Sequence, residues 1–226
     1  MLFRSHLSLP ISGGAFEFDG GAGSDTIVGS PVDATWNLTG TGAGNLGGTT
    51  GLVFTNVESL AGGTGKDTFA FALDTSFGGT IDGGAGATNP LDFSAWTNPV
   101  VVNLSMGIAS GTTRASSFQD AIGGSGDDFL IGDINANRLT AGAGYDTLYG
   151  AGGADILFGN DGRDTLGPHR LDRAVTHPPE DGEAVELAVR GNVAVQPSQT
   201  FGNRLVVVRC GREPGRGALR HHERRG

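Results

Sequence analysis

A nine-residue repeat between Gly123 and Gly167 constrains the fold of this chain more than any other feature of its sequence. Cut every nine residues, the stretch reads GGSGDDFLI, GDINANRLT, AGAGYDTLY, GAGGADILF and GNDGRDTLG. The eighth place is always leucine, and the sixth place is aspartate in four blocks and Asn137 in the second. Repetition at so short a period is typical of small structural units that stack on one another.

The composition supports a stacked architecture without a large core. Glycine accounts for 41 of the 226 residues, and only 37% of the chain is hydrophobic. Such a glycine content is found in disordered, fibrous or repeat chains, and the regular period favours a repeat. The first 167 residues show no sustained 3.6-residue periodicity, so we expect strands and few helices.

Isolated blocks of the same form occur earlier in the chain. GGAGSDTIV begins at Gly20 and GGTGKDTFA at Gly62, and a degenerate block, GGAGATNPLDF, begins at Gly83 with Thr88 at the aspartate place. We therefore predict four segments. These are an N-terminal segment (1–19), two degenerate units of about 40 residues each (20–122), the phased repeats (123–167) and an Arg-rich, flexible, irregular tail (168–226).

The nine-residue block predicts its own local structure. Its last three places form a short strand that turns the leucine inward, and its glycines supply the positive φ angles of a tight turn. Two blocks complete one 18-residue circuit, and circuits stack about 4.8 Å apart. Asp128, Asp146 and Asp164 then form a column on one edge, and Asn137 lies over Asp155 on the other.

Such a column of carboxylates requires a cation. Two carboxylates about 5 Å apart repel each other by roughly 3 kcal/mol at an effective dielectric constant of 20. Carboxylate and turn carbonyl oxygens suit calcium, and the repeats contain no cysteine or histidine that would favour zinc or copper. Residues 1–167 contain 17 acidic and five basic residues. The charge therefore argues against nucleic acid as a partner and in favour of cations.

These residues resemble the glycine-rich nonapeptide repeats, GGxGxDxUx with U apolar, of the RTX (hemolysin-type) calcium-binding proteins. The resemblance covers 123–167 in phase and the single blocks 20–28 and 62–70. It implies an all-β fold, a right-handed parallel β-roll or β-solenoid of short strands with glycine-rich turns, which binds Ca²⁺. The ligands it implies are Gly123, Gly124, Gly126, Asp128, Asn137, Gly142, Gly144, Asp146, Gly153, Asp155, Gly162, Asp164, Asp25 and Asp67.

The resemblance also implies a function and a location. We expect a secreted, extracellular structural or adhesin-type module that folds when it meets calcium, is exported by a type I route and is not an enzyme. Residues 1–12 contain no apolar run of secretory length, and we expect no membrane span. The sequence does not identify a cell-surface or protein partner or an oligomeric state.

Four alternatives stay open at this point. The repeats could form a metal-free glycine-rich stack in which aspartates only cap turns. Asp25 and Asp67 lack a partner block nine or eighteen residues further on, which favours a role as turn residues. The chain could also be a C-terminal accessory or secretion-associated fragment of an RTX protease, lipase or hemolysin whose catalytic domain is absent. A truncated or shifted reading frame would explain the abrupt change after Gly167.

Overall fold

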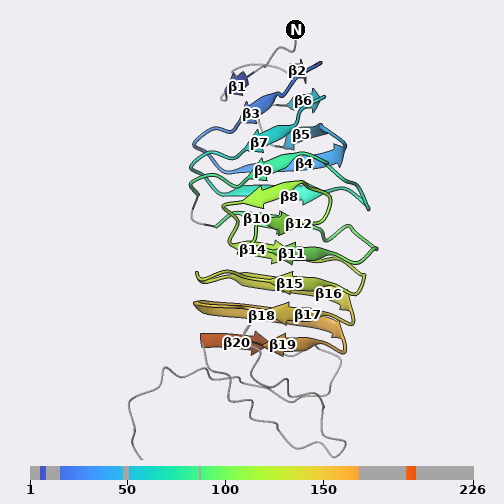
Figure 1. Ribbon diagram of the computed structural model, residues 1–226, viewed down its shortest axis with the longest axis vertical. Helices are drawn as coiled ribbons and strands as arrows, with labels where there is room; N and C mark the ends of the chain where they lie inside the picture. Colours follow the sequence, from blue (N-terminus) through green and yellow to red (C-terminus); the bar gives the residue numbers. More distant parts are fainter. Residues whose placement is uncertain (1–5, 9–15, 48–50, 87, 168–191, 197–226) are drawn as a thin grey trace, which may run out of the picture.

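The computed structural model describes residues 6–8, 16–47, 51–86, 88–167 and 192–196. All regular elements in these ranges are β-strands, which confirms the all-β prediction. The strands lie one above another along the long axis of the molecule, with β1 and β2 at one end and β19 and β20 at the other (Figure 1).

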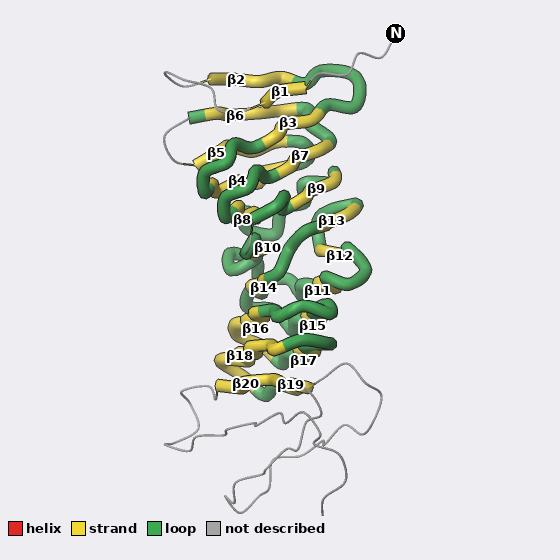
Figure 2. Tube along the Cα trace, turned by 90° about the vertical axis from the view of Figure 1, so that its left-hand side faces the viewer, coloured by secondary structure: helices red, strands yellow, loops and turns green. Residues whose placement is uncertain are grey.

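The strands form two walls that face each other across the core (Figure 2). One wall is a ten-stranded sheet in the order β2 (Phe16–Asp19), β6 (Leu52–Thr55), β5 (Ala43–Gly47), β4 (Ala34–Gly40), β8 (Asp67–Phe71), β10 (Pro90–Asp92), β14 (Asp120–Ile122), β16 (Arg138–Gly144), β18 (Ala154–Gly162) and β20 (Asn192–Gln196).

The other wall consists of two five-stranded sheets placed one after the other. The first has the order β1 (His6–Ser8), β3 (Thr26–Val28), β7 (Ser59–Ala61), β9 (Thr80–Asp82) and β13 (Arg114–Ser116). The second has the order β12 (Ile108–Ala109), β11 (Val101–Asn103), β15 (Phe129–Ile131), β17 (Thr147–Tyr149) and β19 (Thr165–Gly167).

Most neighbouring strands are parallel, and the repeats set their register. Leu130 pairs with Leu148 and Leu148 with Leu166 in one wall, while Leu139 pairs with Leu157 in the other. Partners are 18 residues apart, so each pairing joins alternate nonapeptides, as the sequence predicts. Below, each such step along the stack is called a level. The antiparallel pairs are β4 with β5, β5 with β6, and β11 with β12.

The core lies between the walls and changes in character along the stack. In the repeats it is a column of single leucines, all but Leu166 fully buried. In residues 16–122 it is aromatic, because Trp36 stacks on Phe69 (5.5 Å between ring centroids) and Phe71 stacks on Phe93 (4.3 Å). Stacked rings bury more apolar area per residue than leucine, so this half contains the larger hydrophobic core.

Two features extend or lie beyond the sequence prediction. Strand β20 pairs in parallel with β18, so the ten-stranded sheet includes residues of the predicted tail. The other residues of 168–226, predicted as a flexible tail, lie outside the described ranges. The segment boundaries proposed from the sequence stay a prediction.

Candidate calcium site

Three aspartates form what we call the carboxylate ladder, at the points where the chain enters β15, β17 and β19. The backbone N–H of Asp128 donates a hydrogen bond to Oδ1 of Asp146 (2.7 Å), and the N–H of Asp146 donates to Oδ1 of Asp164 (3.1 Å). Asp128 and Asp146 are only 2% and 1% exposed. The structure thus places Asp128, Asp146 and Asp164 at successive levels, in the order that the 18-residue circuit predicts.

A second series, the amide ladder, lies where the chain enters the ten-stranded sheet. It consists of Asp67, Asn89, Gln119, Asn137 and Asp155. The N–H of Asp67 donates to Oδ1 of Asn89 (2.9 Å), and the N–H of Asn89 donates to Oε1 of Gln119 (2.7 Å). The side-chain amide of Asn137 donates to the Gln119 carbonyl (2.9 Å), and its N–H donates to Oδ1 of Asp155 (3.0 Å). Neutral amides occupy the three middle levels of this ladder.

The turn glycines bring the backbone of successive levels close together. A Cβ atom on Gly142 would overlap the carbonyl oxygen of Gly124, and one on Gly144 would overlap that of Gly126. Gly142 and Gly144 also have φ angles of 127° and 135°, which side chains with a Cβ resist. The carbonyl oxygens of one turn therefore point toward the next turn. The same close approach applies to Gly153, below Asn135, and to Gly162, below Gly144.

The first glycine of the block has a different role. A Cβ on Gly123 would overlap the carboxylate of Asp128, because the side chain of the sixth residue folds back over the start of its own turn. The N–H of Gly124 donates to Oδ2 of Asp128 (2.8 Å) and that of Val100 donates to Oδ1 (2.8 Å). Both oxygens of Asp128 therefore accept hydrogen bonds from the backbone.

Asp146 differs from Asp128 in one respect that bears on metal binding. Its Oδ2 atom is buried and has no hydrogen-bond partner. A buried carboxylate oxygen without a partner is costly, and a bound cation would remove that cost. The nearby donors are carboxylate and carbonyl oxygens, which are the ligands that calcium prefers. The residues of the carboxylate ladder therefore fit a calcium ion.

The side chains alone would not complete a calcium shell. Among the described residues, no group of three or more His, Cys, Asp or Glu side chains could hold a metal ion. A six- to eight-coordinate calcium ion would therefore take part of its shell from the turn carbonyls.

Burial raises the pKa of the ladder carboxyls. It raises the pKa of Asp146 to about 6, against the lowering effect of the hydrogen bond from the Asp128 N–H, and the negative charges of Asp128 and Asp164 add to the rise. Burial also raises the pKa of Asp155 to about 6 and raises the pKa values of Asp128 and Asp164. The ionised ladder is therefore unfavourable without a counter-ion.

The two isolated aspartates lie in the same kind of position, at the entry to a strand. Asp67 accepts hydrogen bonds from Nε1 of Trp36 (3.2 Å) and from the N–H of Gly63 (2.8 Å), which gives each carboxylate oxygen a donor. The N–H of Asp25 donates to Oε2 of Glu58 (2.8 Å), a residue 33 positions further on. Each therefore has a hydrogen-bonded neighbour on the next level, Glu58 for Asp25 and Asn89 for Asp67, at a spacing other than nine or eighteen residues.

Sequence reasoning missed two residues of the amide ladder, Asn89 and Gln119, and it missed Glu58, which accepts the N–H of Asp25. In the block at Gly83, we expected Thr88 at the sixth place, but Asn89 occupies it, because one extra residue is accommodated in the turn. An asparagine directly before the alternating segment PLDF could have revealed this shift. Gln119 and Glu58 carry the same acceptor oxygen on a longer side chain and belong to no glycine block, so no signal in the repeat pattern marks them.

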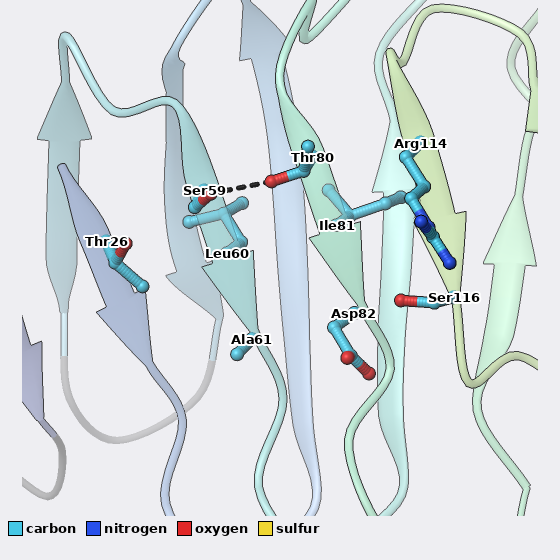
Figure 3. Close-up of a pocket in the computed structure, with 9 residues that line it drawn as sticks. All are labelled: Thr26, Ser59, Leu60, Ala61, Thr80, Ile81, Asp82, Arg114 and Ser116. Atoms are coloured by element: carbon cyan, nitrogen blue, oxygen red, sulfur yellow. Dashed lines mark hydrogen bonds between the residues drawn. The ribbon is translucent and has the colours of Figure 1, made fainter. Parts of the chain in front are cut away.

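A shallow groove of about 330 Å³ lies elsewhere, on the outer face of the first five-stranded sheet (Figure 3). Thr26, Ser59 and Thr80 form one row of hydroxyls across it, and Asp82 and Arg114 lie beside them. The hydroxyls of Ser59 and Thr80 bond to each other at 2.6 Å. The groove does not include any residue of the two ladders.

Comparison with known proteins supports the calcium interpretation. The family described as RTX calcium-binding nonapeptide repeat matches residues 17–31, 121–139 and 131–166, in four copies. The matched residues include Asp25 and the whole carboxylate ladder, whereas the block at Gly62 lies outside them. No curated protein matches the chain.

In the part of the chain that the structure describes, no helix has the length and hydropathy needed to cross a membrane.

RTX nonapeptide repeats are calcium-binding, and the ladder geometry agrees with that chemistry. The chain therefore contains RTX calcium-binding nonapeptide repeats at residues 17–31 and 121–166.

Proposed function

We propose that this chain is a secreted structural module of adhesin type, with no catalytic site, in which calcium orders the nonapeptide repeats as a right-handed β-roll. The observation that carries the proposal is the buried, unpartnered Oδ2 atom of Asp146 between two further carboxylates. The parallel register at 18-residue spacing supports the β-roll.

The ladder and the turns together supply the ligands. Asp128 and Asp146, with the carbonyl oxygens of Gly124 and Gly126, would hold one ion, and Asp146 and Asp164, with those of Gly142 and Gly144, would hold another. A bound divalent cation neutralises the stacked carboxylates and links successive levels. Without it, neighbouring carboxylates repel by roughly 3 kcal/mol at about 5 Å. Calcium therefore favours the stacked state over the unfolded repeats.

The cation requirement also supports the proposed location. Extracellular calcium modules have dissociation constants of roughly 0.1 to 1 mM, well above cytosolic calcium concentrations. Repeats of this affinity would stay unfolded inside the cell and fold outside it. This behaviour suits a chain that leaves the cell unfolded by a type I route, which is the route that the family resemblance implies.

Hydrogen–deuterium exchange of the full chain tests the proposal. We expect the amides of 123–167 to exchange rapidly in chelator and to become protected as calcium is raised to about 10 mM, while the same concentration of magnesium gives little protection. The Asp146→Ala variant should lose this response, and Asp25→Ala should keep it. Equal protection of 123–167 in chelator and in calcium would contradict the proposal.

A further inference from the structure

The loop Phe93–Pro99 stands in the same relation to the first nonapeptide turn as each nonapeptide turn does to the next. The N–H of Ser125 donates to the carbonyl of Trp96 (2.9 Å), as the N–H of Ala143 donates to the carbonyl of Gly124 (3.0 Å). A Cβ on Gly124 would overlap the Trp96 carbonyl, just as one on Gly142 would overlap the Gly124 carbonyl. The loop therefore occupies the position of a preceding turn.

The ladder bond continues across the same junction. The N–H of Val100 donates to Oδ1 of Asp128 at 2.8 Å, and the N–H of Asp128 donates to Oδ1 of Asp146 at 2.7 Å. The first pair is separated by 28 residues and the second by 18. The backbone of 96–100 thus repeats the geometry of a nonapeptide turn, although its sequence, WTNPV, contains neither glycine nor aspartate.

Direct contacts within the chain hold this loop in place. Oδ1 of Asp74 accepts hydrogen bonds from the N–H groups of Thr97 (2.9 Å) and Asn98 (3.0 Å), and Oδ2 accepts one from the Thr97 hydroxyl (2.7 Å). Carboxylate bonds of this kind are charge-assisted and stronger than neutral ones. Asp74 has a φ angle of 48°, so its own backbone is adapted to this contact.

Aromatic packing fixes the other side of the loop. The ring of Trp96 packs edge-on against Phe93 (5.1 Å between centroids) and Phe71 (6.3 Å), and Phe71 and Phe93 stack at 4.3 Å. Phe71 and Phe93 are fully buried. The loop is thereby anchored to the aromatic core of residues 16–122, which lies outside the carboxylate ladder.

We propose that the loop Phe93–Pro99, clamped by Asp74, is a metal-free turn that positions the first nonapeptide turn, Gly123–Asp128, and that calcium-dependent ordering begins there. Asp74 is a positioning residue in this scheme, since it acts on the repeats through the loop and touches none of their ligands. The inference rests on the proposed calcium binding by the repeats. It adds a direction, because the repeats next to the loop become ordered at lower calcium than those further away.

Asp74→Gly in the full chain tests the inference. Glycine removes the carboxylate and tolerates the positive φ angle, so the variant introduces no backbone strain. We expect the calcium midpoint for protection of amides 123–131 to rise about three- to tenfold, because the loop loses its charge-assisted hydrogen bonds to Asp74. Asp74→Asn keeps an acceptor oxygen for the two N–H groups and should restore most of the response. Glu17→Ala removes an exposed charge elsewhere and should leave the midpoint unchanged.

Each outcome is informative. Absence of any calcium response in the unmodified chain would contradict the proposed function itself. A normal response there, with Asp74→Gly at the same midpoint, would overturn the positioning role alone. If Asp74→Gly unfolds residues 16–122 even in chelator, Thr97→Val replaces it, because this exposed change removes only the hydroxyl bond. Thr97→Val should then raise the midpoint about twofold, and an unchanged midpoint would overturn the inference.

Discussion

The carboxylate ladder and most steps of the amide ladder use the same bond, from the N–H of one level to a side-chain oxygen of the next, but the two ladders differ in charge. Between Gln119 and Asn137 the side-chain amide of Asn137 donates to the Gln119 carbonyl instead. Asp128, Asp146 and Asp164 place carboxylates at three successive levels, whereas Asn89, Gln119 and Asn137 place neutral amides between Asp67 and Asp155. An amide can both accept and donate, as Asn137 does, but an ionised carboxylate only accepts. The amides of one ladder therefore bond to the neighbouring levels on both sides, whereas the carboxylate ladder leaves Oδ2 of Asp146 without a partner.

The comparison also separates two parts of the molecule. The amide ladder runs from the levels with the aromatic core into the nonapeptides, where it ends at Asn137 and Asp155, whereas the carboxylate ladder lies only in the nonapeptides with their leucine core. The proposed calcium ordering of 123–167 would thus act on the segment with the weaker hydrophobic core, where the contribution of a bound ion is largest relative to the rest.

The largest expected effect comes from making the carboxylate ladder more like the amide ladder. Asp146→Asn keeps the Oδ1 acceptor for the Asp128 N–H but removes the central negative charge. We expect calcium protection of 123–167 to weaken more than tenfold and the stability in chelator to rise, because one repulsive, buried charge is gone. Hydrogen exchange and thermal unfolding with and without calcium measure both. A loss of stability in both conditions would indicate a purely structural aspartate.

The second expected effect is a dependence of metal-free stability on pH. Folding raises the pKa of Asp146 to about 6, so between pH 4 and 6 the folded state holds a proton that the unfolded state has released. Stability in chelator should therefore fall as pH rises from about 4.5 to 7, by on the order of 2 kcal/mol. Thermal or denaturant unfolding across this range measures it.

The carboxyl of Asp155, whose pKa is also raised to about 6, contributes to the same slope from the amide ladder. Asp146→Asn should remove from the pH dependence of metal-free stability only the contribution of Asp146 and leave that of Asp155 in place. This variant is therefore the matched control. In calcium the trend should reverse, because protons compete with the ion for the carboxylates. A metal-free stability that rises from pH 5 to 7 would contradict the assignment.

A smaller effect is expected when the amide ladder is given a charge. Asn137→Asp loses the donor to the Gln119 carbonyl and sets a carboxylate against it, and it also faces Asp155 on the next level. We expect a loss of about 1 to 3 kcal/mol in chelator and a partial recovery in calcium. Urea unfolding of the full chain in both conditions tests this. Equal losses in chelator and calcium would show that a second carboxylate creates no cation site there.

The smallest effect is expected at Asp67. Its two oxygens already accept hydrogen bonds from Trp36 and Gly63, so Asp67→Asn should cost about 1 kcal/mol of stability through the lost Gly63 bond. The calcium midpoint of 123–167 should stay within about twofold of the unmodified value. A larger shift, measured by exchange and compared with Glu17→Ala, would support the prediction that Asp67 is a calcium ligand.

The regular part of this architecture could be predicted from the sequence, because its period is local. Asp128 and Asp146 are separated by two nonapeptides, so the 18-residue circuit gives their pairing directly. Asp25 and Glu58 are separated by 33 residues and Asn89 and Gln119 by 30, and these unequal spacings produce no period. The antiparallel insertion of β5 (Ala43–Gly47) between β4 and β6 is equally hidden, since it depends on pairing between strands of this wall.

The loop at Trp96 shows a second limit of sequence reasoning. Its turn geometry comes from Asp74 and from aromatic packing, which are tertiary contacts, and not from glycines in the loop itself. Glycine blocks in the sequence therefore do not reveal a turn whose geometry is set by residues outside the turn. The metal preference, in contrast, follows from residue types alone, and the family match agrees with it.

The direction of the ladder bonds gives the stack a polarity. In the carboxylate ladder, the backbone N–H of one level donates to the side chain of the level that follows it in the sequence, as the N–H of Asp128 does to Asp146. A side chain removed at one level therefore leaves an unsatisfied amide one level closer to the N-terminus. A substitution in the ladder should therefore increase hydrogen exchange most at an amide that lies one level closer to the N-terminus than the substituted residue.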